Sequence, residues 1–323
     1  MPQHPTARLP WRPGTTPLML APMQGVTNRA VRAHFIATVR PDVVFTEFVR
    51  VAGASRKRVA RSDLREMATT GGEVPLVVQL VGHDRAALVE AAQIAENAGA
   101  RHLNLNLGCP YGRMTTGLTG GALLQRPDLL AEIVPALRDA CHGSFSIKLR
   151  AGYDNYTAAR ELLPLFETAG VDYLILHPRT VVEGYRGAAD HRVTAALVAG
   201  SRLPVIANGD IRSTADGLHL LKASGAAGLM LGRGALADPL LFQRLRGLAP
   251  ATATANERLL QLRQTLAALL ERYRNLFCGD VQILSKIKGV LGTMEDPIYA
   301  RQVDELKQTR TLADFSRCLA QRS

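Results

Sequence analysis

The stretch "LNLNLGCPYG", residues 103–112, alternates apolar and amide side chains and then stops at a Gly-Cys-Pro turn. Alternation with a period of two is typical of a β-strand, because successive side chains point to opposite faces. Gly108 and Pro110 flank Cys109, and they favour a shaped, exposed turn over a buried structural cysteine. The stretch therefore predicts a strand that ends in an accessible thiol.

Seven other short apolar runs have a similar β-rich composition, over residues 17–23, 43–48, 75–82, 144–152, 173–180, 204–211 and 228–236. Helical patterns separate most of them. In residues 84–99, for example, Asp84 is the expected N-cap and Gly99 the expected terminator. Eight strands alternating with helices predict an α/β fold, a closed parallel (β/α)8 TIM barrel. An open doubly wound sheet is disfavoured, because Gly25 does not belong to a GxGxxG turn.

The chain is predicted to have three parts. Residues 1–16 are rich in Pro and Arg and lack the apolar core of a secretory signal, so we expect a flexible lead-in. Residues 17–248 form the barrel. After the linker-like "ATATANE", only helical patterns follow, which predicts a small all-helical C-terminal domain over residues 256–323. A helical extension of the barrel is the alternative.

Composition bounds the class of protein. The chain has 323 residues, of which 47% are hydrophobic, and no apolar run approaches the ~18 residues of a membrane span. Its four cysteines lie far apart without CxxC or zinc-site spacing, which favours a reducing cytoplasm and no metal site. The formal charge of +11 favours a polyanionic partner. Basic residues gather over residues 50–65, which contain only one acidic residue, Asp63. The basic residues are Arg50, Arg56, Lys57, Arg58, Arg61 and Arg65.

Nearly every predicted strand ends in polar or glycine residues. In a TIM barrel the carboxyl ends of the strands open onto one face, which holds the active site. We therefore expect these residues to meet Cys109 in one mouth. They are Met23 to Gly25, Glu47, Gln79, residues 106–109, Lys148, Arg150, His177, Arg179, residues 208–210, Gly232 and Arg233.

Two glycine-containing turns in this set suggest a mononucleotide cofactor. Gly232 and Arg233 follow the eighth strand, where barrels commonly bind phosphate, and Asn208 to Asp210 follow the seventh. Tight turns also need glycine, so a purely structural role is the alternative. Lys148 could stabilise the negative charge of a reduced flavin, and Gln79 could bind a flat heteroaromatic ring. His177 fits the same site or a structural role.

Cys109 has two chemical roles open to it. A nucleophile needs a thiolate and a partner base. A proton donor needs the neutral thiol, which dominates at neutral pH because an ordinary thiol has a pKa near ~8.5. The substrate decides between these roles.

A set of motifs in one order and spacing carries a family resemblance: "LAPMQGVTNRAVR", "NLGCP", "IKLRAGYD", "HPRTVVEGYRG", "VIANGDI" and "LGRGAL", followed by the helical tail. The chain resembles the tRNA-dihydrouridine synthases, flavoenzymes that reduce a D-loop uridine of tRNA. "TEFVRV" and "SKIKG" are most similar to the bacterial C-type subgroup. The resemblance covers essentially the whole chain.

The resemblance implies FMN as cofactor, NADPH or NADH as electron donor, and reduction of U16 by a cytoplasmic monomer without a membrane partner. Hydride would pass from flavin N5 to C6 of the uracil, and Cys109 would protonate C5. The implied FMN contacts are Pro22, Met23, Gln24, Gln79, Lys148, His177, Asn208, Gly209, Asp210, Gly232 and Arg233. Asn106, Arg150, Arg179 and Tyr185 would face the uridine and its neighbours. Arg50, Lys286 and Lys288 would contact the tRNA.

Two departures from the family pattern stand out. Asn104 occupies a position where the family usually has Asp, and Gly112 stands where it usually has Lys, with Arg113 beside it. Arginine differs from lysine in shape and reach, so the loop change bears on substrate position. Two alternatives stay open. One is an FMN barrel acting on a free pyrimidine, like a dihydroorotate dehydrogenase, which would need neither the basic stretch nor "SKIK". The other is a non-catalytic tRNA-binding protein.

Overall fold

The computed structural model describes residues 9–53, 58–67, 73–110 and 118–321. Residues 1–8 of the predicted lead-in, and the loop positions Gly112 and Arg113, lie outside the described residues. The chain divides into two compact units, which we describe in turn. The first comprises Met1–Pro22, Asp42–Asp210 and His219–Met230; the second comprises Met23–Pro41, Ile211–Leu218 and Leu231–Ser323.

A ring of parallel strands forms the centre of the fold. Within the described ranges its eight members are β1 (Leu18–Leu20), β2 (Val43–Phe45), β4 (Leu76–Val81), β5 (His102–Leu107), β6 (Ser144–Arg150), β7 (Tyr173–His177), β8 (Val205–Asn208) and β9 (Gly228–Leu231). The ring closes because β1 lies between β2 and β9 while β2 also pairs with β4. The predicted TIM barrel is confirmed. A short strand that the sequence did not predict, β3 (Val49–Arg50), pairs with β4 outside the ring.

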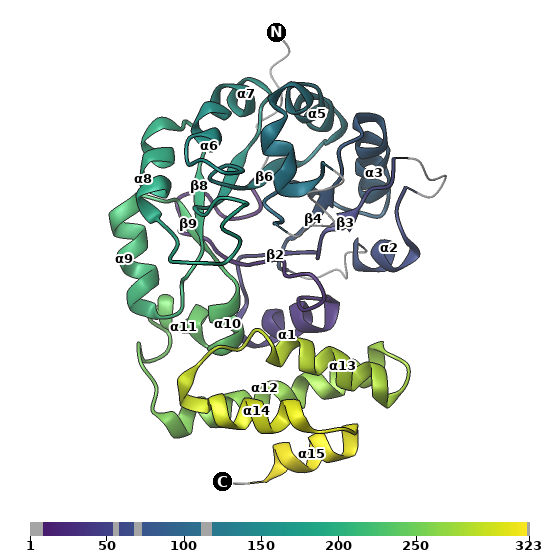
Figure 1. Ribbon diagram of the computed structural model, residues 1–323, viewed down its shortest axis with the longest axis vertical. Coiled ribbons are helices and arrows are strands. Elements are labelled where there is room, and N and C mark those ends of the chain that lie inside the picture. Colours follow the sequence, from purple (N-terminus) through teal and green to yellow (C-terminus); the bar gives the residue numbers. More distant parts are fainter. Residues whose placement is uncertain (1–8, 54–57, 68–72, 111–117, 322–323) are drawn as a thin grey trace. The chain divides into compact units, whose positions relative to one another are not determined.

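Helices cover the outside of this ring (Figure 1). Those in the first unit are α2 (Arg61–Met67), α3 (Arg85–Asn97), α5 (Pro127–Ala140), α6 (Ala158–Glu161), α7 (Leu163–Thr168) and α8 (His191–Gly200), with the 3-10 helix η1 (Gly120–Gln125) after β5. Helix α9 (Thr214–Ser224) belongs partly to each unit. The predicted ends of α3 are confirmed. The Asp84 carboxylate accepts from the Ala87 N–H at 2.8 Å, and Gly99 has a φ of +97°.

Strand β5 explains the alternating sequence. Leu103, Leu105 and Leu107 belong to the apolar cluster shared with buried residues of α3 and α5. Asn104 and Asn106 lie on the opposite face, where Asn104 is the register partner of both Gln79 and Ser146. The amides therefore point into the barrel. A second cluster fills another part of the interior with apolar side chains: Met19, Ala21, Val43, Phe45, Val77, Tyr173, Ile175, Ile206 and Met230.

The second unit is helical. It contains α1 (Arg29–Val39), α10 (Arg233–Ala237), α11 (Leu241–Leu245), α12 (Ala255–Leu276), α13 (Asp280–Leu291), η2 (Pro297–Tyr299), α14 (Ala300–Gln308) and α15 (Leu312–Ala320). A capping box of Thr254 and Glu257 starts α12. Asn28 caps α1 and donates to the Tyr273 hydroxyl of α12. The predicted helical C-terminal region is present, whereas the domain boundaries at residues 248 and 256 stay predictions.

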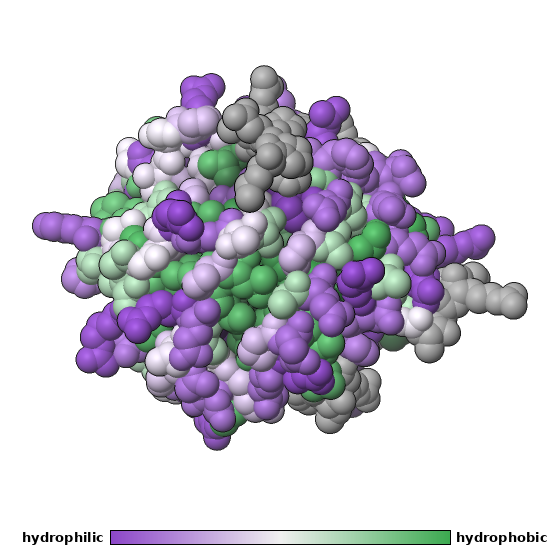
Figure 2. Space-filling view, turned by 90° about the horizontal axis from the view of Figure 1, so that it is seen from above, coloured by the Kyte–Doolittle hydropathy of each residue, from purple (hydrophilic) through white to green (hydrophobic). Residues whose placement is uncertain are grey.

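The surface of the described chain is mostly hydrophilic where Figure 2 shows it. Hydrophilic side chains cover much of this face, and hydrophobic side chains gather in a smaller central area. No helix among the described residues is long and apolar enough to cross a membrane.

Candidate active site

Polar side chains meet at the carboxyl ends of β4 to β8 in the first unit. Asn106 is the register partner of Lys148, and Arg150 is the register partner of His177. Gln79 reaches this group because its amide oxygen accepts from the Asn106 amide at 2.8 Å. The structure therefore brings these five predicted site residues to one end of the barrel, as the sequence indicated.

The turn that carries Cys109 is shaped by Asn106. The Asn106 Oδ1 atom accepts from the backbone N–H groups of Gly108 and Cys109, both at 3.0 Å. Cys109 is only 7% exposed and packs with Val81 and Phe48. The thiol is thus less accessible than the sequence suggested, because these two apolar residues cover it.

Sequence reasoning missed the glycines that close on this turn. Gly121 donates its N–H to the Cys109 carbonyl at 3.2 Å. Gly120 has a φ of +59°, and a Cβ there would lie 3.0 Å from the Cys109 Cβ. Only glycine adopts this positive φ without strain and also leaves room for the Cys109 side chain. The adjacent Gly-Gly pair in the sequence was the signal that could have found this support.

Lys148 is a half-buried cation beside this turn. Burial, followed by the nearby charge of Arg150, lowers the pKa of Lys148 to about 8, while Cys109 acts in the opposite direction. The ammonium is therefore charged at neutral pH but titrates within a unit or so above it. Such a group can stabilise negative charge that develops beside it.

Arg150 braces the two loops on either side of it. It is 1% exposed, and its Nε donates to the Gly108 carbonyl at 2.9 Å. Its Nη1 donates to the carbonyls of Thr180 and Gly184, at 2.8 and 2.6 Å. Its Cζ lies 5.2 Å from the centre of the half-exposed Tyr185 ring. These bonds hold the turn before Cys109 against the loop after β7, and the predicted contact with uridine stays a prediction.

Arg179 fixes the state of His177. Its Nη1 lies 3.0 Å from the His177 Nε2, and it forms an ion pair with Asp210 at 2.6 Å. Because a guanidinium can only donate, Nε2 of His177 must accept, which places the ring proton on Nδ1. His177 is therefore a neutral imidazole that can donate only through Nδ1. Arg179 is 2% exposed, so it acts on the site through His177 in this structure.

The turn after β8 has a demanding backbone. Asn208 donates to the Met230 carbonyl at 2.8 Å, which ties β8 to β9. Gly209 has a φ of +120°, and a Cβ there would lie 3.0 Å from the His177 ring. Asp210 has a φ of +51° and accepts from the Ala189 N–H at 2.8 Å as well as from Arg179. The Asp210 carboxylate thus orients Arg179, and its predicted cofactor contact stays a prediction.

Several predicted contacts lie outside this cluster. Pro22 ends the first segment of the first unit, and Arg50 is exposed at the end of β3. Met23, Gln24, Gly232 and Arg233 belong to the second unit, and their predicted cofactor contacts stay predictions. In that unit Met23 donates its N–H to Thr27 Oγ1 at 2.7 Å, Gln24 is exposed, and Arg233 Nη1 lies 3.5 Å from Glu295.

The two predicted tail lysines differ in their surroundings. Lys286 Nζ lies 5.6 Å from the centre of the Phe277 ring, which is a cation–π geometry. Lys288 donates to the Thr309 carbonyl after α14. Both are half-buried members of α13, and their predicted contact with tRNA stays a prediction.

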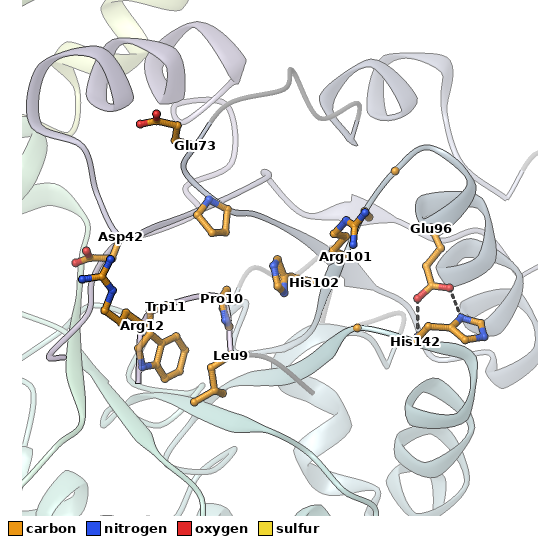
Figure 3. A pocket seen from close by; sticks show the side chains of 14 residues that line it. Leu9, Pro10, Trp11, Arg12, Asp42, Glu73, Glu96, Arg101, His102 and His142 are labelled. Carbon is orange, nitrogen blue, oxygen red and sulfur yellow. Dashed lines mark hydrogen bonds and ion pairs between the residues drawn. The ribbon is translucent and has the colours of Figure 1, made fainter. Parts of the chain in front are cut away.

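A pocket of about 870 Å³ lies at the other end of the barrel (Figure 3). It is lined by residues at or before strand starts, including Asp42, Pro75 and His102, and by His142, which binds Glu96. Burial, followed by the charge of Arg101, lowers the pKa of His102 to about 4. This pocket lies at the start of β5, whereas Cys109 follows the end of that strand, so the pocket is not part of the candidate site. The described part of the chain has no cluster of three metal-ligating side chains.

The fold and the strand-end residues define a class: a (β/α)8-barrel enzyme that places a thiol, a cation and a neutral imidazole at the carboxyl ends of its strands. Comparison with known proteins is more specific. The profile of the family described as "Dihydrouridine synthase (Dus)" matches residues 19–319. The chain therefore belongs to the dihydrouridine synthase family, whose members are FMN-dependent oxidoreductases.

Curated relatives support this assignment. The chain is 37% identical over 225 residues to a probable tRNA-dihydrouridine synthase of Rhodobacter capsulatus, which covers 69% of this chain and 68% of that protein. It is 35% identical over 253 residues to the tRNA-dihydrouridine(16) synthase of Cupriavidus necator, covering 76% and 79%. Among solved structures, morphinone reductase is similar in fold, with a TM-score of 0.53 at 14% identity over 73% of this chain and 87% of that one.

The residues of the first unit fit a flavin. A reduced flavin needs positive charge nearby, and its ring edge needs hydrogen-bonding groups of fixed orientation. Lys148 could supply the charge, Gln79 is an amide held by two neighbours, and His177 could donate through Nδ1. This donor set matches the cofactor that the family uses.

Proposed function

We propose that this protein reduces uridine 16 in the D-loop of tRNA to 5,6-dihydrouridine, with bound FMN as cofactor and NADPH or NADH as electron donor. The observation that carries the proposal is the position of the Cys109 turn. It follows β5 at the same end of the barrel as Lys148, which lies near the end of the neighbouring strand β6. The names of the relatives support tRNA as substrate, and the designation of the Cupriavidus necator relative supports position 16. We infer that the protein acts as a monomer in the cytoplasm, where tRNA is modified.

The chain's own residues divide the reaction between them. Bound FMN would supply hydride to C6 of the uracil. The Cys109 thiol would hold the proton for C5 on the opposite side of the ring, because a neutral thiol is a sufficient acid there. Asn106 fixes the thiol by holding the two N–H groups of its turn. Lys148 would stabilise negative charge at the cofactor, and Val81 and Phe48 would keep water from the thiol.

The target base must leave the tRNA stack before it can lie between a thiol and a flavin. Basic residues outside the strand-end cluster would hold the tRNA while this happens. Arg50, Lys286 and Lys288 are the proposed contacts, with Asn106, Arg150, Arg179 and Tyr185 nearer the uridine. The buried guanidinium groups of Arg150 and Arg179 would act there mainly by holding Tyr185 and His177 in place.

The test is a map of dihydrouridine in tRNA from cells with and without the gene. Loss at position 16 alone would support the whole proposal. Loss at another D-loop position would keep the reaction and overturn the position, whereas no loss would overturn the tRNA reaction. Purified protein with FMN and NADPH, supplied with tRNA, free uracil or orotate, separates tRNA reduction from the free-pyrimidine alternative. A protein that binds tRNA but not FMN would instead be a non-catalytic binder.

A further inference from the structure

A chain of side-chain amides runs across the barrel interior, and its direction can be assigned. It begins at Asn106, whose Oδ1 accepts from the backbone N–H groups of Gly108 and Cys109. A backbone N–H can only donate, so this atom must be the oxygen and the other must be Nδ2. The Asn106 amide nitrogen therefore donates to Gln79, whose facing atom must be Oε1, at 2.8 Å.

The same logic carries the direction back to β5 and then on to β6. With its Oε1 toward Asn106, Gln79 turns its Nε2 toward Asn104, whose Oδ1 accepts at 2.8 Å. Asn104 then donates through Nδ2 to the Ser146 Oγ, also at 2.8 Å. The Ser146 hydroxyl donates a hydrogen bond to the Leu103 carbonyl at 3.3 Å. Each of the three amides has one allowed orientation, because reversing it would oppose two donors or two acceptors.

We propose that Asn104 and Ser146 are positioning residues for the flavin site, which fix the orientation of the Gln79 amide through this directional chain. The inference rests on the proposed flavin function. An amide carries two N–H groups and two acceptor lone pairs, so Gln79 keeps one of each beyond these two bonds. This row of hydrogen bonds therefore decides which end of the Gln79 amide donates to a flavin ring and which end accepts from it.

The amide at position 104 has a second consequence. Asn104 is 1% exposed, so a carboxylate there would place a buried charge within the interior that holds Lys148 and Tyr173. A carboxylate would still accept from Gln79, but it could not donate to Ser146. Its negative charge would also disfavour the reduced, anionic flavin. Asn104 thus keeps the interior beneath Lys148 neutral and so favours the reduced flavin.

The experiment compares three variants with the wild-type protein loaded with FMN. Asn104→Asp keeps the acceptor for Gln79, Asn104→Leu removes both bonds, and Ser146→Ala removes only the last acceptor. Asn256→Asp, at the exposed start of α12 in the second unit, adds the same charge outside this set of hydrogen bonds and is the matched control. The measurements are FMN affinity, by quenching of flavin fluorescence, and the midpoint potential, by spectroelectrochemistry.

We expect Asn104→Leu to weaken FMN binding about tenfold or more, Ser146→Ala to weaken it less, and Asn104→Asp to restore most of the affinity. Asn104→Asp should lower the midpoint potential, and the difference should shrink at low pH as the carboxyl gains a proton. The other titratable groups of this interior are Lys148, Arg150, His177, Cys109 and Tyr173. The control should change neither value. Wild-type affinity in Asn104→Leu, or an unchanged potential in Asn104→Asp, would overturn the proposal.

A readout without cofactor separates this proposal from the proposed function. Hydrogen exchange of the Gln79 side-chain N–H groups, followed by NMR in flavin-free protein, reports the bond to Asn104 directly. We expect slow exchange in the wild type and in Asn104→Asp, and fast exchange in Asn104→Leu. If the wild type fails to bind FMN but shows this pattern, the flavin assignment is wrong and the amide chain stands. Equal exchange rates in all three proteins would overturn the chain itself.

Discussion

The barrel interior has two parts of opposite character. Strands β4 to β6 fill one part with Gln79, Asn104, Asn106, Ser146 and Lys148, whose polar atoms bond to one another or approach the Cys109 turn. Strands β1, β2 and β7 to β9, together with Val77 of β4, fill the other part with apolar side chains such as Phe45, Ile175 and Ile206. A protein that needed only stability could use apolar side chains throughout, because buried polar groups and charges must each be matched by a partner. The polar part is therefore where function outweighs stability, and substitutions in the two parts should fail in different ways.

The largest expected effect is on chemistry, at Cys109. Cys109→Ala should lower the rate of tRNA reduction about 10²–10⁴-fold while FMN and tRNA binding remain, because only the proton donor is lost. Single-turnover reoxidation of reduced enzyme by tRNA measures this step. Cys278→Ala, at an exposed cysteine of the second unit, is the control and should react like the wild type. Wild-type turnover by Cys109→Ala would rule out the thiol as the acid.

In the apolar part, Phe45→Ala should act on stability instead. Phe45 is 1% exposed in the interior, so its truncation leaves a cavity and should lower the free energy of unfolding by about 3–5 kcal/mol. Urea unfolding of flavin-free protein measures the loss. The folded fraction should keep its FMN affinity. If Phe45→Ala unfolds like the wild type but loses FMN binding, the apolar part would serve cofactor binding and the proposed difference between the two parts would be wrong.

A substitution at Lys148 should raise the free energy of unfolding instead of lowering it, because the buried charge of Lys148 destabilises the folded protein. Its folded pKa is about 8 against an ordinary value of 10.5. Below pH 8 the folded and unfolded chains both carry the proton, so the cost is complete; from pH 8 to 10.5 the folded chain sheds the proton first and stability rises. Lys148→Met should therefore stabilise flavin-free protein at pH 7 on the order of 2 kcal/mol. Urea unfolding at pH 7 and pH 10 should show the gain shrinking, and an equal or lower stability at pH 7 would contradict the buried charge.

The smallest expected effect is that of Ile206→Val. Ile206 is 0% exposed in the apolar part, and removing one methylene should cost about 1 kcal/mol of unfolding free energy. Thermal unfolding of this variant beside Phe45→Ala tests whether the cost grows with the volume removed. A loss as large as that of Phe45→Ala would mean that the apolar part has less freedom to relax than a packed barrel core usually has.

The sequence by itself determined the elements and their order. Alternation in residues 103–107, the cap at Asp84 and the glycine at position 99 act within one strand or one turn, so their effects can be predicted without a partner. The closed ring followed from eight such strands alternating with helices. The same local logic placed Cys109 at a strand end and Lys148 at the next one.

Only the tertiary structure decided which distant groups meet. The burial of Arg150 against the carbonyls of Gly108 and Thr180, the pairing of Arg179 with His177 and Asp210, and the closure of Gly120 on Cys109 all join separate segments. Strand β3 also pairs with Leu80 and Val81 of β4, a contact between separate segments. A side chain's hydrogen-bond partners depend on strand register and loop path, which local sequence does not encode. For that reason Cys109 could be proposed as the proton donor from the sequence, whereas the hydrogen-bonded amides that order the residues around it could not be predicted.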